Sequence, residues 1–245
     1  MLEMLLTTLI LVTAQANPID EAGRMAVTFW SQFPGVKCTE RILQTKLREN
    51  GEVIINRKSE FDYVALLKHQ AGGLSIEESR VALSGSTPDE QNELLLTSGF
   101  PSFMLMFHPD FRDRFEFQEP GVLTSDGSIT VAFKSRPDAH SMSAFKLRDR
   151  TYPILWKGLV WINGKTGAIS RIEAELGSSM EELGLSGLRA EVEYAPVMLS
   201  GSSIWLPRRA TVSLRTRRQQ WRNVHEYTNY RLFSVTTSSQ PGNPK

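Results

Sequence analysis

The first third of the chain contains one stretch in which apolar residues recur every three or four positions. This stretch runs from Ile19 to Phe33, and Pro34-Gly35 follows it directly. Such spacing places apolar side chains on one side of a helix, and proline with glycine interrupts helices. The pattern therefore predicts one amphipathic helix. Its apolar positions are Ala22, Met25, Ala26, Phe29, Trp30 and Phe33.

Beyond that helix the apolar spacing changes to two, which is typical of strands with one buried face. Arg41 to Leu47 and Val53 to Leu67 show this spacing, and Glu49-Asn50-Gly51 lies between them. Asn-Gly between two such runs is a strong signal for a tight turn. The segment is predicted to form a β-hairpin.

Two short helices are predicted in the middle of the chain. Thr87-Pro88-Asp89-Glu90 combines a capping threonine, a first-turn proline and an acid at the third helical position, and Gly99 ends this helix. The second helix is predicted to start at Pro101 and to be stopped by Pro109.

Strand character returns after the second helix. It is found in Arg114 to Glu119 and in Ser128 to Ser135, with a turn at Asp126-Gly127 between them. The following segment, Arg136 to Arg150, is polar and aperiodic, and it is predicted to be a long loop.

The last third of the chain shows the clearest alternation. Trp156 to Ile162 and Ile169 to Leu176 are joined by the turn-rich segment Asn163 to Gly167, which predicts a hairpin. Further strands are predicted around residue 190, from Ala210 to Arg215 and from Val224 to Val235. Alternate residues of a strand share a face. The residues predicted to face inward are Ile172, Ala174, Leu176, Ala190, Val192, Tyr194, Ala210, Val212 and Leu214.

Together these elements predict a mainly β protein of the α+β class, with an antiparallel meander at its C-terminal end. A chain of 245 residues can bury a full hydrophobic core, and residues 17–235 are predicted to form a single domain. The polar residues 236–245 are predicted to be a disordered tail.

Residues 1–16 are predicted to be a signal peptide. An apolar core runs from Leu5 to Val12, and Ala14-Gln15-Ala16 has the small-x-small pattern of a cleavage site. Glu3 stands where a signal peptide usually carries positive charge, so a membrane anchor is the competing interpretation. The core is shorter than the roughly 20 residues needed to span a bilayer, which favours cleavage. No later segment is predicted to span a membrane.

The cysteine content agrees with export to a bacterial periplasm, where disulfides are optional. Cys38 is the only cysteine, so an internal disulfide is excluded. For Cys38, a small side chain in a strand is a better interpretation than a reactive thiol.

The outward faces of the last strands carry many charges, while the net charge of the chain is only +1. The protein as a whole therefore has too little positive charge to attract nucleic acid electrostatically. Opposite charges across a ladder pair favourably, so the arginines are predicted to form a solvated face with the acids. Left unpaired, they would instead bind an acidic partner. The arginines are Arg208, Arg209, Arg215, Arg217, Arg218 and Arg222, and the acids are Glu173, Glu175, Glu191 and Glu193.

Motifs for catalysis or metal binding are missing from the sequence. It contains no G-x-S-x-G, no H-E-x-x-H and no paired-cysteine spacing. Gly164-Lys165-Thr166 resembles the end of a phosphate-binding loop, but a strand follows where that loop needs a helix. A hydrolase that uses His140 or Ser141 ranks last among the hypotheses. The protein is predicted not to be an enzyme and to hold no cofactor or metal.

The segment from Phe100 to Phe107 is apolar on every side of a short predicted helix. It is rich in phenylalanine and methionine, which adapt to irregular surroundings. The segment either fills an ordinary core or forms a lid over an apolar cavity. The strand from Trp156 to Ile162 is apolar on both faces, which predicts that protein or ligand covers both.

Two segments carry a resemblance to a known family. Gly158-Leu159-Val160-Trp161-Ile162, followed by Gly167-Ala168-Ile169-Ser170-Arg171-Ile172-Glu173, is similar to a hairpin of the outer-membrane lipoprotein-sorting (LolA-like) superfamily of periplasmic carriers and sensors. Tyr227-Thr228-Asn229-Tyr230-Arg231 is also similar to that superfamily. The order of elements resembles it over most of the chain after residue 16. The resemblance implies an incomplete antiparallel barrel, or strongly curved sheet, wrapped around a few helices with an apolar interior that receives acyl chains.

The leading hypothesis is a periplasmic, non-catalytic carrier or binding protein for a lipid or lipoprotein acyl chain. Burying an acyl chain yields about 0.8 kcal/mol per methylene, so affinity needs no catalytic group. The alternative is an envelope interaction or stress-sensor protein that binds an acidic partner through its arginine-rich outer face. The predicted ligand-binding residues are Phe103, Met104, Met106, Phe107, Val192, Tyr194, Val212 and Leu214.

Overall fold

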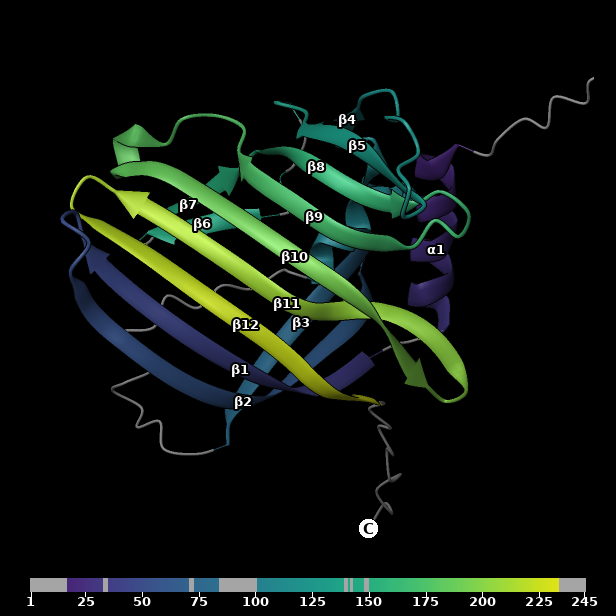
Figure 1. The fold of residues 1–245 in the computed structure, drawn as a ribbon, viewed down its shortest axis with the longest axis horizontal. Coiled ribbons are helices and arrows are strands. Elements are labelled where there is room, and N and C mark those ends of the chain that lie inside the picture. The colour runs from purple at the N-terminus through teal and green to yellow at the C-terminus, as the bar shows by residue number, and fades with distance from the viewer. Residues whose placement is uncertain are drawn as a thin grey trace, which may run out of the picture.

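The computed structural model describes residues 17–32, 35–70, 73–83, 101–138, 141, 143–147 and 150–233. Over these residues the protein is mainly β, and its central element is a ten-stranded antiparallel sheet (Figure 1). The strands of this sheet are β1 Gly35–Arg48, β2 Val53–Gln70, β3 Gly73–Ala82, β4 Phe115–Phe117, β5 Ser128–Ser135, β8 Trp156–Asn163, β9 Ile169–Leu176, β10 Leu185–Leu199, β11 Ser202–Thr216 and β12 Gln219–Leu232.

The sheet does not close into a barrel. Its strand order is β3-β2-β1-β12-β11-β10-β9-β8-β5-β4, so β3 and β4 are the two edges. The C-terminal meander from β8 to β12 meets the N-terminal hairpin through the pairing of β12 with β1. In that pairing Glu40 lies opposite Tyr227, and Leu43 lies opposite Val224. A sheet of this length coils because its strands twist, and the result is a curved sheet with a concave and a convex face.

Two helices pack on the concave face. They are α1, Pro18–Gln32, and the 3-10 helix η1, Pro101–Phe107, which contact each other. Figure 1 shows α1 beside the end of the sheet where β8 turns into β9. Gly167 in that turn has φ +69°, and a Cβ there would lie 2.5 Å from the Glu21 carbonyl carbon. Only glycine permits both the backbone conformation and this close approach of α1.

The core lies between the concave face and these helices. The predicted inward residues of the last strands are buried there: Ile172, Ala174, Ala190, Val192, Tyr194, Ala210, Val212 and Leu214 are each at most 6% exposed. Leu176 is half-buried and packs against the same core. The predicted amphipathic helix is also confirmed, because Ala22, Ala26, Phe29 and Trp30 of α1 are buried. The alternation of apolar residues therefore identified the buried face correctly.

The predicted β1–β2 and β8–β9 hairpins are confirmed; β1 and β2 are longer than predicted, whereas the strand predicted from Arg114 to Glu119 is only Phe115–Phe117. Glu49-Asn50-Gly51 forms the turn between β1 and β2, where Gly51 has φ +86°. The turn at Asp126-Gly127 precedes β5, which has the predicted bounds Ser128–Ser135. β12 starts at Gln219 rather than at Val224, because its first residues pair with both β11 and β1.

The helix predicted from Pro101 is the 3-10 helix η1, which ends at Phe107, before Pro109 as predicted, and Pro109 also begins the next helix. α3, Pro109–Arg112, has His108 as its N-cap, whose side chain accepts a hydrogen bond from the Asp110 backbone N–H. Proline suits the first turn of a helix, because the N–H that it lacks would have no partner there.

The segment Arg136 to Arg150 is not the predicted long loop. Residues of its second half form β6, Ser143–Leu147, which pairs with β7, Arg150–Ile154, in a separate two-stranded sheet. Five residues per strand are too few for alternation to stand out from the charged residues on either side. A further short 3-10 helix is η2, Glu181–Leu183.

Several predictions fall on residues outside the described part of the chain. They concern the signal peptide at residues 1–16, Phe33 at the end of the first helix, the helix from Thr87 to Gly99, His140 and the tail at residues 236–245. No helix among the described residues is long and apolar enough to cross a membrane.

Candidate functional site: a plugged apolar interior beside a buried ionic cluster

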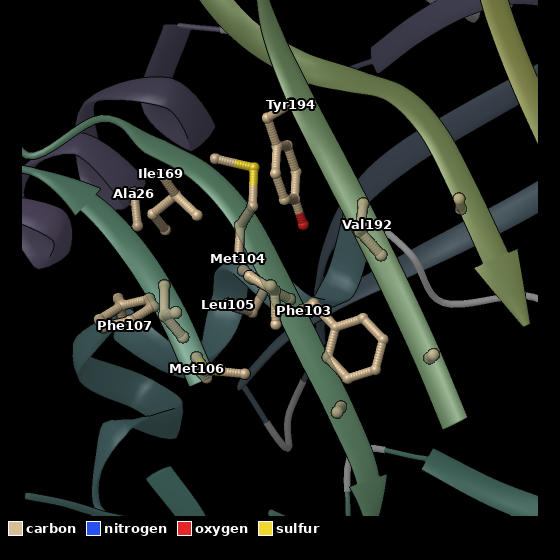
Figure 2. Packing of buried hydrophobic residues seen from close by; sticks show 14 of the residues in the cluster. Ala26, Phe103, Met104, Leu105, Met106, Phe107, Ile169, Val192 and Tyr194 are labelled. Carbon is tan, nitrogen blue, oxygen red and sulfur yellow. The ribbon is translucent and has the colours of Figure 1, made fainter. Parts of the chain in front are cut away.

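The centre of the apolar interior is occupied by η1. Its last five side chains are almost completely buried, and all of them are apolar. Phe103 lies edge-on to Trp156 of β8, with ring centroids 5.5 Å apart. The ring centroids of Phe107 and Phe117 of β4 are 5.2 Å apart. Figure 2 shows Met104 between Ile169 and Tyr194, with Phe103 and Phe107 directed to opposite sides. The helix therefore fills the interior in several directions at once. The five residues are Phe103, Met104, Leu105, Met106 and Phe107.

The eight residues predicted to bind a ligand lie in one hydrophobic cluster on the concave face. Four of them belong to η1, and the other four belong to β10 and β11. Val192 and Tyr194 of β10, both labelled in Figure 2, belong to the same buried cluster as the side chains of η1. The structure thus brings together residues more than 80 positions apart, as a shared interior requires.

Around Met104, the described part of the interior is nearly full. Two cavities lie beside Met104, each of about 20 Å³: one is bounded also by Phe29, Trp30 and Tyr63, and the other also by Met25 and Ile169. A space of this size holds about one water molecule. Neither cavity accommodates an acyl chain, so such a ligand could enter this described region only if η1 moved.

The strand from Trp156 to Ile162 is covered on one face only. Trp156, Val160 and Ile162 are buried on the concave face. On the convex face Leu159 is 38% exposed, whereas Trp161 is partly covered by the Arg171 guanidinium, 5.0 Å from its ring centroid. The prediction that both faces are covered is therefore wrong for Leu159, because none of the described residues forms a second layer on this part of the convex face.

A buried ionic cluster occupies the other half of the concave face. Glu40 of β1 is 0% exposed and accepts two hydrogen bonds from Arg80 of β3, at 2.5 and 3.0 Å. The Nδ1 atom of His225 on β12, also 0% exposed, lies 2.8 Å from Glu40 Oε1. Beside these residues, the side-chain amide of Gln44 on β1 donates a hydrogen bond to Asn223 Oδ1 on β12 at 3.1 Å. Charges from three strands thus meet where the sheet is shielded from water.

The protonation of the cluster follows from its contacts. Burial opposes the charge on Glu40, but hydrogen bonds from His225 and Arg80 outweigh it, and the pKa of Glu40 is lowered. Burial lowers the pKa of His225, although Glu40 acts in the opposite direction. The cluster therefore contains a carboxylate, a guanidinium and a neutral imidazole whose Nδ1–H donates to Glu40.

Aromatic and thiol groups surround this cluster. The Arg80 guanidinium lies 5.0 Å from the Tyr63 ring centroid, and the rings of Tyr63 and Tyr227 lie 5.6 Å apart. The hydroxyls of both tyrosines are buried, and neither has a hydrogen-bond partner in the described structure. Burial raises both pKa values, so both phenols stay protonated. Burial also raises the pKa of Cys38 to about 12, which makes it the inert buried thiol that was predicted.

Sequence reasoning missed this cluster, although a signal was present. Cys38, Glu40, Ile42 and Gln44 alternate along β1, and all four are buried. Glu40 therefore stands at an inward position between apolar residues. A charge at such a position needs a partner, but the sequence does not indicate that the partners come from β3 and β12.

The convex face pairs its charges differently from the prediction. Glu193 bonds Arg208, but Glu173 and Glu191 are bridged by Arg171, Glu173 also pairs with Arg189, and Glu175 pairs with Lys157. Glu173 and Glu191 lie opposite each other in the register, so nearby cations are drawn between them. In the described structure the other five predicted arginines form no ion pair: Arg209, Arg215, Arg217, Arg218 and Arg222.

The hydrolase hypothesis gains no support from the described residues. The Ser141 hydroxyl donates to the Ile154 carbonyl at 2.5 Å, and His140 lies outside the described part of the chain. No group of histidine, cysteine or acidic side chains that could hold a metal ion is found among the described residues.

Comparisons with known proteins identify no family for this chain. No protein-family model and no curated protein matches the sequence. The structure is similar to the crystal structure of a DUF1329 family protein from Desulfovibrio piger, with 11% sequence identity and a TM-score of 0.46. The match covers 91% of this chain and 96% of that chain. Function must therefore be argued from the residues of this chain.

Proposed function

We propose that this protein is an exported, non-catalytic carrier or binding protein that holds a lipid or lipoprotein acyl chain in the apolar half of its concave face. The observation that carries the proposal is η1, a short helix with only apolar buried side chains at the centre of an open curved sheet. The acyl chain would take the place of these side chains. A curved sheet around a few helices is also the architecture that the LolA-like resemblance implies.

The physical properties of η1 suit a displaceable plug. A 3-10 helix has poorer hydrogen-bond geometry than an α-helix, and seven residues is long for one. No salt bridge ties the side chains of Phe103 to Phe107 to the sheet, since all are apolar. Their burial is worth about 1.5 to 3 kcal/mol for each large side chain, and an acyl chain gains about 0.8 kcal/mol per buried methylene. Some ten methylenes would therefore offset the displacement of three or four such side chains.

A brominated fatty acid should quench the fluorescence of Trp156. Trp156 contacts Phe103, so bromine atoms that replace this ring lie next to the indole. We expect Trp156→Phe to remove a large part of the quenching. Trp161→Phe is the matched control, because Trp161 lies on the opposite face of the same strand. This substitution is expected to leave the quenching unchanged.

Native mass spectrometry of the purified protein provides the independent measurement. A lipid-sized adduct, or uptake of a fluorescent fatty acid, is expected. If neither is seen, and both tryptophan variants behave like the unchanged protein, η1 is a permanent part of the core and the carrier proposal is wrong.

Export is part of the proposal and has its own test. Cleavage after Ala16 would leave Asn17 as the first residue, directly before the start of α1 at Pro18. Expression in a Gram-negative bacterium should give a periplasmic form whose mass equals that of residues 17–245. A full-length form retained in the inner membrane would show that residues 1–16 are an anchor.

A further inference from the structure

Four of the five convex-face arginines that form no ion pair lie at or near one end of the sheet. Arg217 and Arg218 form the turn between β11 and β12, Arg215 is the last residue but one of β11, and Arg222 follows on β12. These four side chains are exposed, and within the described structure none forms an ion pair. These four arginines, together with Arg209 in the middle of β11, are called the basic surface below; Arg209 and Arg222 line one hollow. Figure 1 shows the β11–β12 turn at the end of the sheet away from α1.

The β1–β2 turn lies beside the basic surface and adds exposed aliphatic side chains to it. Arg48 pairs in register with Gln219, which places the two turns next to each other. Val53 is 54% exposed and Ile54 is 42% exposed. Arg48 is neutralised by its ion pair with Glu52, so this turn contributes apolar area more than charge.

Two open hollows extend over the same surface. One, of about 620 Å³, is lined by four cations and two carboxylates, with Leu43 and Val224 among its other lining residues. The second, of about 540 Å³, lies between the two turns and includes Arg218 and Ile54. The cations of the first hollow are Arg41, Lys58, Arg209 and Arg222, and its carboxylates are Glu60 and Glu226.

We propose that the basic surface docks the protein on a membrane that contains anionic phospholipids. Charge complementarity selects an anionic partner, and the exposed Val53 and Ile54 select one with an apolar layer beneath its charges. Two neighbouring turns at one end of a sheet can touch a flat surface together. A folded acidic protein would satisfy the arginines but would give Val53 and Ile54 no comparable apolar contact.

The acids nearest this end do not cancel the charge of the basic surface. Glu49 lies in the β1–β2 turn, and Glu181 and Glu182 lie in η2, which precedes β10. In the described structure none of these three acids forms an ion pair with the four exposed arginines. Arginine side chains are long enough to reach lipid phosphates while the acids stay solvated.

The proposal is tested by vesicle co-sedimentation of the full chain. Vesicles of phosphatidylcholine with phosphatidylglycerol should bind the protein, and vesicles of phosphatidylcholine alone should bind it much less. Replacing Arg215, Arg217 and Arg218 with glutamine should weaken binding by about fivefold per arginine, or about 100-fold in all. Raising the salt concentration from about 0.05 to 0.5 M should weaken the binding of the unchanged protein, because the Debye length shortens.

Two further triple variants serve as controls. Lysine at the same three positions keeps the charge and should retain most of the binding. Arg24→Gln with Arg112→Gln and Lys134→Gln removes the same net charge from exposed cations elsewhere that already have acid partners, and it should bind vesicles normally. Quenching of Trp156 by a brominated fatty acid should be the same in all three, so failure here is distinguishable from failure of the carrier proposal.

Two results would overturn membrane docking. One is equal binding of the glutamine variant and the unchanged protein to anionic vesicles. The other is absence of vesicle binding by the unchanged protein together with charge-dependent binding to polyglutamate, which would assign the basic surface to an acidic protein partner instead.

Discussion

Replacing Phe103 with alanine is expected to lower the free energy of unfolding by about 3 to 5 kcal/mol and to strengthen the binding of a fatty acid. The loss of stability follows from burial, since Phe103 is 8% exposed and packs against Trp156. The gain in binding follows from the plug, because alanine leaves space that a hydrocarbon chain can fill. The melting temperature of this variant should therefore rise more steeply with fatty acid concentration than that of the unchanged protein.

Phe133→Ala is the matched control for this experiment. Phe133 is 3% exposed and packs against Phe115, and it belongs to β5 rather than to η1. Its loss should destabilise the protein by a similar amount, but without a comparable gain in fatty acid binding. If fatty acid stabilises both variants equally, Phe103 does not occupy the acyl site.

Replacing Glu40 with glutamine is expected to cost about 3 to 5 kcal/mol of stability, because it removes the buried carboxylate charge that the Arg80 guanidinium contacts with two hydrogen bonds. The side chains of Glu40 and Arg80 are 0% and 11% exposed, and the bond between them is bidentate. Asp62→Asn is the control, since its ion pair with Lys37 lies at the surface. That variant should lose at most about 1 kcal/mol in a chemical denaturation experiment.

The same cluster should make the protein less stable in acid. Folding lowers the pKa of His225 below 6.5 and that of Glu40 below 4.5, so the unfolded chain binds more protons once the pH falls below each value. Stability should therefore decrease below pH 6.5 and decrease further below 4.5. Glu40→Gln should flatten the second part of this decline. An unchanged slope below pH 4.5 would show that other carboxylates determine it.

The sequence by itself determined most strands of the large sheet and their buried faces, but it did not indicate β3, β6 or β7. Val192 and Tyr194, like Val212 and Leu214, were assigned to the interior from alternation alone, and all four are buried. The turns at Asn50-Gly51 and Asp126-Gly127 were also predicted from the sequence. These features are local, because the side-chain period of a strand and the backbone requirements of a turn are set by a few neighbouring residues.

The tertiary structure decided which strands are neighbours and what they bring together. The contact of Glu40 with His225 joins residues 185 positions apart, and it exists because β12 pairs with β1. Arg80 reaches the same carboxylate from β3, two strands away on the other side. The sequence places the charged Glu40 at an inward position, but no neighbouring residue in the sequence indicates which side chains pair with it. Whether the arginines of the convex face were paired was likewise settled by register, which placed Arg171 and Arg189 beside the acids and left Arg217 and Arg218 at the turn.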